Sequence, residues 1–285
     1  MEQTVDAAKK IVVVGGGKMG EAIMKGWISC AEGAAEPIVA SNIQVVEPSP
    51  ERRAFLTETH GVACVEDVLQ ADGADMVVIA VKPQVMAAML SNLVKNEQLS
   101  PAGASAPLFV SIAAGQTTAG IEAQLGGKPQ LVRVMPNMPL AVGAGASGVC
   151  GGAFAQADQV VYVAELFDCL GKGVVVDESQ MDTVCALSGS GPAYVAAMIE
   201  AMRDAAVSNG LDAELAEALA LQTVLGTAQL ISSTNASVAQ TRESICSPGG
   251  TTIAALEAMY AAGFDEVFKA GIDAAVARSK ELASC

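Results

Sequence analysis

The sequence predicts an α/β fold in which a parallel-sheet domain precedes an all-helical domain. Short β-branched runs such as Ile11–Val14 and Met76–Val81 recur in the first half, as expected for buried parallel strands. After residue 176 the pattern becomes alanine-rich and helical. A chain of 285 residues is long enough for two domains of this kind. We therefore expect one domain over residues 1–176 and a second over residues 177–285.

Composition narrows the range of partners. The formal net charge is -15, which argues against nucleic acid and against anionic membrane surfaces. The seven cysteines are scattered without a CxxC pair, and the single histidine, His60, has no partner at ligand spacing, so no metal site is predicted. No signal peptide precedes Ile11–Val14, and prolines and glycines break the uncharged stretch 134–157. These features favour a reducing, cytoplasmic location.

A glycine-rich turn follows the first strand directly. Gly15, Gly17 and Gly20 form a GxGxxG motif between that strand and a helix over Glu21–Ile28. The first glycine makes the tight turn, the second lets a pyrophosphate approach the backbone, and the third lets helix and strand pack closely. The motif therefore predicts a Rossmann domain that binds a dinucleotide. We expect Lys18 and Met19, inside the motif, to contact the cofactor as well.

The second strand, Ile43–Glu47, gives two opposing indications about the cofactor. An acidic residue at the end of this strand, here Glu47, usually binds the ribose hydroxyls and favours NAD. Ser49, Arg52 and Arg53 follow directly and would suit the 2′-phosphate of NADP. The same residues would also suit the solvated start of a helix. The choice between NADP and NAD stays open on this evidence.

Further strands are expected at Gly61–Val65, Met76–Val81, Leu108–Ala113 and Leu131–Met135, with an edge strand at Val174–Val176. The carboxyl ends of parallel strands are where a dinucleotide lies. Small residues and backbone amides recur at these ends and suit the nicotinamide half of the cofactor. The residues we assign to cofactor binding there are Ala80, Val81, Lys82, Pro83, Ala113, Ala114 and Asn137.

The second half reads as a series of helices. Gly210 is a plausible helix stop and Asp212 a plausible N-cap for the next helix. Leu211–Leu230 is apolar over most of its circumference, which indicates contact with a partner subunit or a central position within one subunit. The expected helices cover residues 160–170, 179–188, 192–209, 213–232, 238–245, 251–261 and 265–282, with another at 50–59 in the first half.

This helical half is poor in acid–base groups. Between Gly173 and Phe268 there is no lysine and no histidine, and the only cations are Arg203 and Arg242. An enzyme that reduces a carbonyl needs a proton donor for the developing alkoxide, commonly His or Lys. A protonated imine escapes this need, because hydride addition neutralises an existing charge. Positioning then does most of the catalysis.

Two serine- and glycine-rich segments open helices in this half. One is Ser188–Gly191, and the other is Ser247–Thr252, which contains Gly249, Gly250 and Thr251. A helix N-terminus presents free backbone N–H groups and can hold an anion, and threonine hydroxyls can add donors. Each segment alone would suit an ordinary turn. Together, beside a nucleotide fold, they indicate a pocket for a small carboxylate.

At this point the sequence resembles pyrroline-5-carboxylate reductase over nearly its whole length. The resemblance implies reduction of Δ1-pyrroline-5-carboxylate to proline with NADP or NAD as cofactor. It also implies a Rossmann domain followed by a helical dimerisation domain, with a homodimer or a higher assembly such as a decamer. The motifs that carry it are Gly15–Gly20, Val81–Pro83, Ala113–Gly115, Met135–Asn137, Leu187–Tyr194 and Ser247–Thr252.

Carried over residue by residue, the resemblance implies that Ser247, Gly249, Gly250 and Thr252 bind the substrate carboxylate. Many family members have a threonine three residues before the Ser-Gly-Ser motif, and here that position is Cys185, a weaker donor. Asn235 stands where an acidic residue is common. Cys185, Ser188 and Ser190 are therefore the candidate catalytic residues, with water as another proton source. The alternatives are a 3-hydroxy-acid dehydrogenase, which predicts a lysine on helix 192–209 that is absent, and a non-catalytic nucleotide-binding oligomer.

Overall fold

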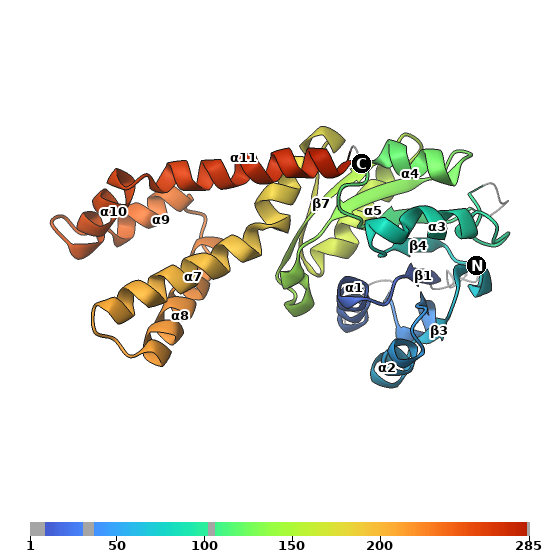
Figure 1. Cartoon of the computed structure of the whole chain (residues 1–285), viewed down its shortest axis with the longest axis horizontal. Coiled ribbons are helices and arrows are strands. Elements are labelled where there is room, and N and C mark those ends of the chain that lie inside the picture. The colour runs from blue at the N-terminus through green and yellow to red at the C-terminus, as the bar shows by residue number, and fades with distance from the viewer. Residues whose placement is uncertain (1–8, 31–36, 102–105, 284–285) are drawn as a thin grey trace, which may run out of the picture. The chain divides into compact units, whose positions relative to one another are not determined.

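The structure is a computed structural model that describes residues 9–30, 37–101 and 106–283 (Figure 1). It forms two compact units. The first unit runs to Gly189 and takes in the chain again from Ala275, and the helical unit is Ser190–Ala274. The domain boundary expected after residue 176 stays a prediction. The sequence before the second strand, Ala31–Asn42, is typical of a surface insertion, and its residues 31–36 lie outside the described residues.

The first unit is built on one eight-stranded sheet with the order β3-β2-β1-β4-β5-β6-β7-β8. Strands β1 to β6 are parallel, β7 is antiparallel to β6, and β8 is parallel to β7. The order 3-2-1-4-5-6 is that of a doubly wound dinucleotide-binding fold and confirms the predicted class. The strands are β1 (Ile11–Val14), β2 (Ile43–Val46), β3 (Ala63–Val65), β4 (Met76–Ile79), β5 (Leu108–Ser111), β6 (Leu131–Met135), β7 (Gly145–Gly151) and β8 (Gly171–Val175).

Helices cover both faces of this sheet, because successive strand residues point to opposite sides. Val13 and its neighbours pack on one face against Trp27 and Phe167, whose rings meet edge-to-face at 5.8 Å. Val12 and Val14 pack on the other face with Leu90. The first face is covered by α1 (Lys18–Ser29), α2 (Pro50–His60) and α5 (Ala157–Asp168), and the second by α3 (Pro83–Leu93) and α4 (Thr118–Leu125). Short 3₁₀ turns are η1 (Ala40–Asn42), η2 (Val68–Gln70), η3 (Met138–Val142) and η4 (Glu178–Gln180).

Strand β7 is absent from the prediction. Its sequence, Gly145–Gly151, is made of glycine, alanine, serine, valine and cysteine and has little β propensity. Small residues are required there because atoms of neighbouring residues come close. A Cβ on Gly148 would lie 2.7 Å from Val184 Cγ1, and one on Gly171 in β8 would lie 2.2 Å from the carbonyl oxygen of Gly145. Packing, not propensity, therefore sets this part of the sheet.

The C-terminal helices agree closely with expectation except at residues 179–188. There a single helix was predicted, whereas η4 leads into α6 (Met181–Val184) and a π-helix, η5 (Cys185–Gly189). Asp212 is the N-cap of α8, accepting hydrogen bonds from the amides of Glu214 and Leu215 as expected. The remaining helices are α7 (Gly191–Ser208), α8 (Ala213–Ser232), α9 (Val238–Ile245), α10 (Thr251–Ala261) and α11 (Phe264–Ala283).

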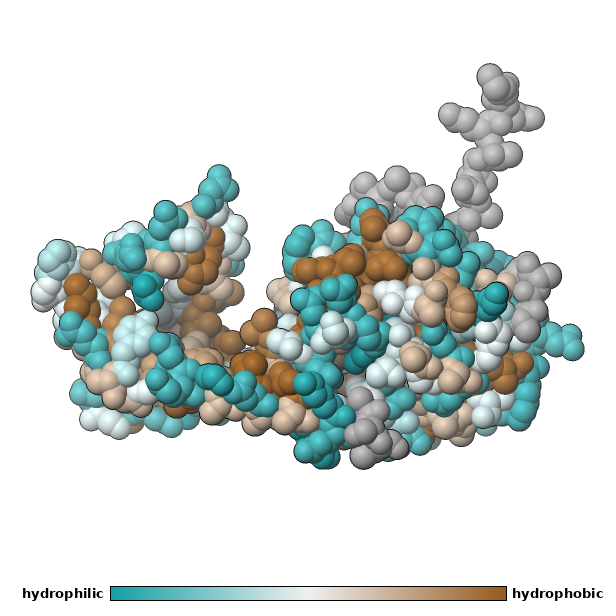
Figure 2. All heavy atoms as spheres, turned by 90° about the horizontal axis from the view of Figure 1, so that it is seen from above, coloured by the Kyte–Doolittle hydropathy of each residue, from teal (hydrophilic) through white to brown (hydrophobic). Residues whose placement is uncertain are grey.

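The helical unit leaves much of its apolar surface uncovered. Of its described residues only Ala216, Ala220 and Thr241 are buried. Brown, hydrophobic side chains accordingly reach the surface of this unit in Figure 2. Helix α8 is long and apolar enough to cross a membrane by length and composition alone, and 11% of the relevant stretch is buried. Large exposed side chains include Leu211, Leu215, Leu219, Leu221, Leu225 and Leu230.

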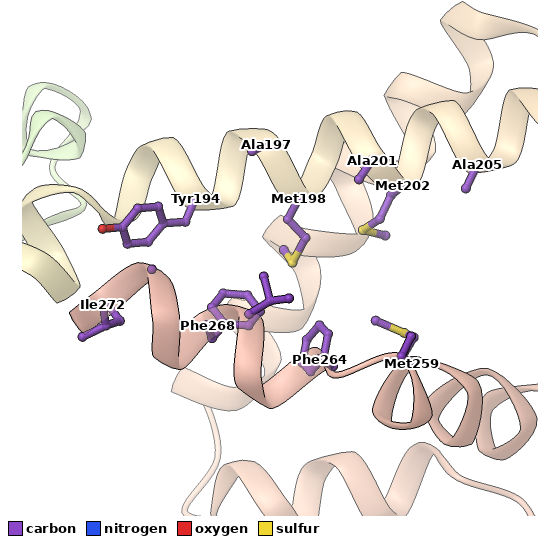
Figure 3. A pocket seen from close by; sticks show the side chains of 13 residues that line it. Tyr194, Ala197, Met198, Ala201, Met202, Ala205, Met259, Phe264, Phe268 and Ile272 are labelled. Carbon is purple, nitrogen blue, oxygen red and sulfur yellow. The ribbon is translucent and has the colours of Figure 1, made fainter. Parts of the chain in front are cut away.

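An apolar groove of about 710 Å³ lies within the same unit. Its walls come from α7, from the end of α10 and from α11 (Figure 3). Met198 and Met202 of α7 face Phe264 and Phe268 of α11 across it, with Met259 at one end (Figure 3). A groove so rich in methionine and aromatic carbon is suited to another apolar surface.

Candidate active site

The glycine loop has the close backbone approaches that the motif predicts. Gly15 has φ +110°, and a Cβ there would lie 2.6 Å from the carbonyl oxygen of Ala80 on the neighbouring strand. The amide of Gly15 donates to the carbonyl oxygen of Val46 at 2.9 Å. A Cβ on Gly20 would lie 2.1 Å from the carbonyl oxygen of Gly15. The first and third glycines of the motif are therefore required by the fold itself.

Gly17, the second glycine of the motif, differs from the other two. A Cβ on Gly17 would meet no heavy atom of the described chain within 4 Å. Gly17 is also the N-cap of α1, and no side chain caps the free amides of that first turn. An open approach to an uncapped helix N-terminus fits the pyrophosphate of a dinucleotide. Lys18 and Met19 form the first turn of that helix, whose amides have no acceptor within the helix.

Two candidate partners for the adenosine ribose follow β2. The Glu47 carboxylate accepts from the amide of Gly16 at 3.1 Å and from the amide of Ser49 at 3.0 Å. The Arg52 side chain donates from Nε to the carbonyl oxygen of Gly16 at 2.6 Å and pairs with Glu21 on α1. Both the acidic residue typical of NAD sites and the cation typical of NADP sites therefore lie beside the glycine loop.

The strand ends expected to hold the nicotinamide half lie along the same sheet. Lys82 is the exposed N-cap of α3, with Pro83 at the first helical position and Ala80 and Val81 just before it. Ala113 is buried and lies two residues after the end of β5. Ala114 comes next, before a left-handed glycine turn. These residues share the carboxyl edge of the sheet, and their contacts with a cofactor stay predictions.

Asn137 uses both ends of its side-chain amide within the protein. Its Nδ2 donates to the carbonyl oxygen of Ser188 at 2.9 Å, and its Oδ1 accepts from the amide of Ala146 at 2.8 Å. Asn137 is buried, so these two bonds satisfy the polar atoms of its side chain, which water does not reach. The residue fixes the π-helix η5 against the end of β6 and the start of β7. Its assignment to cofactor binding stays a prediction.

The candidate catalytic residues stand on and just after the π-helix. π-Helices are rare and occur frequently at functional sites. Cys185 begins η5 and is half-buried, and the Ser188 hydroxyl donates to the carbonyl oxygen of Val184 at 2.9 Å. Ser190 precedes α7 as its N-cap, without a capping bond from its own side chain. Among the described residues no group of three or more His, Cys, Asp or Glu side chains could hold a metal ion.

The segment Ser247–Thr252 forms the expected turn and helix start. Gly249 is left-handed, with φ +70°, and the amide of Gly250 closes the turn on the carbonyl oxygen of Ser247 at 2.9 Å. Gly250 is the N-cap of α10, and no side chain caps the first turn of that helix. The amides of Thr251 and Thr252 are therefore available to an anion. The turn and the helix start agree with expectation, and carboxylate binding stays a prediction.

Three ion pairs of the first unit are absent from the sequence-based prediction. Glu21 of α1 pairs with both Arg52 and His60, and Arg133 in β6 pairs with Glu178. A basic residue inside an otherwise apolar strand was the available sign of the Arg133 pair, since a buried cation needs a partner. Nothing in the sequence pattern indicates the two pairs of Glu21, because Arg52 and His60 lie 31 and 39 residues away from it.

Two family models match the chain. One described as pyrroline-5-carboxylate reductase dimerisation matches residues 178–282, and one described as NADP oxidoreductase, coenzyme F420-dependent, matches residues 10–115. With the sheet order and the open glycine loop, they define a dinucleotide-dependent oxidoreductase that carries a dimerisation domain. The chain is 40% identical to a pyrroline-5-carboxylate reductase from Synechocystis, with 95% of this chain and 97% of the relative covered. The chain belongs to the pyrroline-5-carboxylate reductase family.

Further relatives agree with this placement. A pyrroline-5-carboxylate reductase from Pseudomonas aeruginosa is 38% identical, with 96% of this chain and 97% of the relative covered. The solved structure of the Coxiella burnetii pyrroline-5-carboxylate reductase is similar with a TM-score of 0.86 at 36% identity, covering 97% of this chain and 99% of that one. The structure of Plasmodium falciparum pyrroline carboxylate reductase with NADP bound has a TM-score of 0.79 at 29% identity, covering 96% and 98%. The expected fold and family are confirmed.

Proposed function

We propose that the protein reduces Δ1-pyrroline-5-carboxylate to L-proline with NADPH, the final step of proline biosynthesis, and that NADH can replace NADPH. The observation that carries this function is the 40% identity to a pyrroline-5-carboxylate reductase over 95% of the chain. The open N-terminus of α1 at Gly17 supports a dinucleotide cofactor independently.

The reaction converts NADPH, a proton and the cyclic imine to NADP and proline. When bound, the cofactor supplies the hydride that adds to the ring carbon of the C=N bond. The imine nitrogen is protonated before or during this addition, so no alkoxide develops that would require a strong acid. The absence of lysine and histidine from residues 174–267 suits this chemistry.

We assign cofactor binding to the first unit. Gly17, with the amides of Lys18 and Met19, receives the pyrophosphate. Ser49 and Arg52 receive the 2′-phosphate. The remaining cofactor contacts are assigned to the other motif glycines and to the strand ends: Gly15, Gly20, Ala80, Val81, Lys82, Pro83, Ala113, Ala114 and Asn137.

We assign the substrate carboxylate to the start of α10. The amides after Gly250 and the hydroxyls of Thr251 and Thr252 bind the carboxylate, a role that arginine or lysine has in many other proteins. Ser247 and Gly249 shape the turn that exposes these amides.

We assign the proton route to residues on and just after the π-helix. Cys185, Ser188 and Ser190 are the candidates, and bound water is a further source. The Ser188 hydroxyl already donates to Val184, so in this conformation it accepts more readily than it donates. We therefore favour Ser190, whose side chain makes no capping bond, as the group that orients the imine nitrogen or its water.

We propose a cytoplasmic homodimer, or a higher assembly such as a decamer, in which a second copy covers the helical unit. The match of residues 178–282 to a dimerisation family supports association of like chains. The apolar groove between α7 and α11 and the exposed leucines of α8 are complementary in chemistry. A protein–protein interface accounts for the apolar surface of α8 without a membrane.

A substrate panel tests this function. The purified protein is mixed with NADPH or NADH and with pyrroline-5-carboxylate, a cyclic imine that lacks the carboxylate, or a 3-hydroxy acid with oxidised cofactor. We expect rapid loss of reduced cofactor with pyrroline-5-carboxylate, little loss with the imine that lacks the carboxylate, and no formation of reduced cofactor with the 3-hydroxy acid. Binding of the cofactor without turnover on any imine would indicate a non-catalytic nucleotide-binding protein instead.

A further inference from the structure

We propose that Glu21 and His60 set the preference of the cofactor site between NADPH and NADH, by holding the Arg52 guanidinium on an internal carboxylate. Glu21 acts through Arg52 and is a positioning residue, not a catalytic one. The proposal rests on the assignment of the 2′-phosphate to Arg52 under the proposed function. It adds Glu21 on α1 and His60 at the end of α2 to the residues that determine cofactor choice, and neither residue is part of a cofactor-binding motif.

The two oxygens of the Glu21 carboxylate contact two different side chains. Oε2 pairs with Nη2 of Arg52, and Oε1 lies 2.9 Å from Nε2 of His60. Arg52 also donates from Nε to the carbonyl oxygen of Gly16 at 2.6 Å. Glu21 lies in the first turn of the helix that starts at the glycine loop. The carboxylate therefore lies beside the opening that the pyrophosphate is expected to enter.

Other charged groups around Arg52 are already engaged. Glu47 accepts from two backbone amides, and Glu51 accepts from the Ser49 hydroxyl at 2.8 Å. Arg53 donates to the carbonyl oxygens of Glu47 and Pro48, both at 2.8 Å, and faces Glu66 at 3.6 Å. Glu21 is therefore the acidic side chain that neutralises Arg52 among the described residues near the loop.

Glu21 is ionised in this setting at neutral pH. Burial alone would raise the pKa of its carboxyl group, but the hydrogen bonds from His60 and Arg52 outweigh burial and lower the pKa below its ordinary value. The Glu21 carboxylate thus competes with any other anion for Arg52. The side chains of Arg52 and Glu21 are 27% and 23% exposed, so the competition is weakened by solvent and remains reversible.

Binding of a 2′-phosphate becomes an exchange of partners. Arg52 leaves the Glu21 carboxylate for the phosphate, and Glu21 keeps its bond to His60, so the carboxylate is never left without a partner. NADH lacks the phosphate and leaves the pair intact. Without Glu21 the guanidinium would be free for phosphate from the start. We expect the loss of a partly exposed ion pair to tighten phosphate binding by roughly two- to fivefold.

The test measures binding without turnover. Adenosine 2′,5′-bisphosphate carries the phosphate pattern of NADP, and AMP lacks the 2′-phosphate. Calorimetry with the full-length Glu21→Gln protein should give bisphosphate binding roughly two- to fivefold tighter than the unsubstituted protein, with AMP unchanged. Glu58→Gln is the control, because it removes one negative charge from the exposed surface of α2, the helix that also carries Arg52.

His60 provides a second variant with the opposite sign. His60→Phe retains a ring against Phe55, which the histidine ring meets edge-to-face at 6.2 Å, and removes the bond to Glu21. Glu21 would then hold Arg52 alone, so bisphosphate should bind more weakly and AMP equally well. In the double variant Glu21→Gln/His60→Phe the effect of His60→Phe should disappear.

Steady-state kinetics give an independent readout. In Glu21→Gln the KM for NADPH should fall while kcat and the KM for NADH stay unchanged. Weaker bisphosphate binding in Glu21→Gln would overturn the proposal, since it would mean that Glu21 orients Arg52 for the phosphate. Equal changes for bisphosphate and AMP would overturn it too, because they would indicate general disruption of the loop. Failure to reduce pyrroline-5-carboxylate with either cofactor would refute the proposed function and leave these binding results intact.

Discussion

Arg133 and Glu178 form a partly buried ion pair that joins the segment after β8 to the middle of the sheet. Nη1 of Arg133 in β6 donates to Oε1 of Glu178 at 2.6 Å, and the Arg133 residue is 4% exposed. The amide of Thr118, at the start of α4, donates to the same oxygen at 3.2 Å. Glu178 thereby fixes the chain just before the π-helix that carries Cys185.

Glu178→Gln should destabilise the first unit at neutral pH by about 2 kcal/mol, because it leaves the Arg133 charge buried without its counter-ion. The pKa of Glu178 is lowered: burial acts to raise it, but hydrogen bonds from Thr118 and Arg133 prevail. Stability from the charged form is then fully present above the ordinary glutamate pKa of 4.5 and is lost as pH falls through the lower folded value.

Urea unfolding of the original protein and Glu178→Gln at neutral pH and at about pH 3 checks this prediction. The difference between the two proteins should be largest at neutral pH and should shrink in acid. Glu58→Gln on the exposed face of α2 controls for net charge. A difference that persists unchanged at the lower pH would mean that Glu178 contributes through packing, not through its charge.

The glycines of the loop should respond differently to a side chain. Gly17→Ser keeps a good N-cap residue and meets no chain atom within 4 Å, so folding should be intact. The new hydroxyl occupies the phosphate approach, and NADPH should bind roughly tenfold more weakly. Gly20→Ala would place its Cβ 2.1 Å from the Gly15 carbonyl oxygen and should cost more than about 2 kcal/mol of stability.

Thermal unfolding separates these two outcomes, and fluorescence titration with NADPH measures the binding. The prediction requires that Gly17→Ser melts normally and binds poorly, whereas Gly20→Ala melts early. Normal NADPH affinity in a folded Gly17→Ser protein would place the pyrophosphate elsewhere.

Arg52→Ala should raise the KM for NADPH about fivefold and the KM for NADH much less. The physical reason is the loss of a cation that binds the 2′-phosphate. The effect on the KM is limited because Arg52 must first leave Glu21 before it binds the phosphate. Initial rates with each cofactor at saturating substrate measure the two constants. If both constants rose by the same factor, Arg52 would be a structural residue of the loop through its bond to Gly16.

Thr252→Val should raise the KM for pyrroline-5-carboxylate roughly three- to tenfold with little change in the KM for NADPH. Valine has nearly the shape of threonine and removes the hydroxyl donor from the first turn of α10. Thr241→Val on the neighbouring helix α9, where the side chain is buried, is a matched control for the loss of a hydroxyl group. An unchanged substrate KM would identify Ser247–Thr252 as an ordinary capped turn.

Local sequence patterns predict most of the fold. β-branched runs and the glycine motif predict the parallel strands, and their order follows from the dinucleotide-binding class. The starts of α8, α9 and α10 agree with expectation because the N-caps Asp212, Ser237 and Gly250 mark them. Strand β7 was missed because close tertiary contacts, which propensity does not reflect, select its small residues.

Contacts between distant residues are the part that the sequence does not reveal. The Ser279 hydroxyl donates to the Asp182 carboxylate at 2.7 Å, although the two residues are 97 positions apart in the sequence. This bond joins the last part of α11 to the first unit. The triad of Glu21, Arg52 and His60 likewise depends on how α1 and α2 pack. Such side-chain pairings require the three-dimensional arrangement of the helices, which periodicity alone does not specify.

The most direct test of the central claim follows the hydride. The protein is incubated with pyrroline-5-carboxylate and NADPH that carries deuterium at C4 of the nicotinamide ring, on each face in separate reactions. The account predicts proline with one deuterium at ring carbon C5 from one of the two labelled cofactors, in amounts equal to the NADPH consumed. Absence of proline, or proline without deuterium from either cofactor, would contradict it.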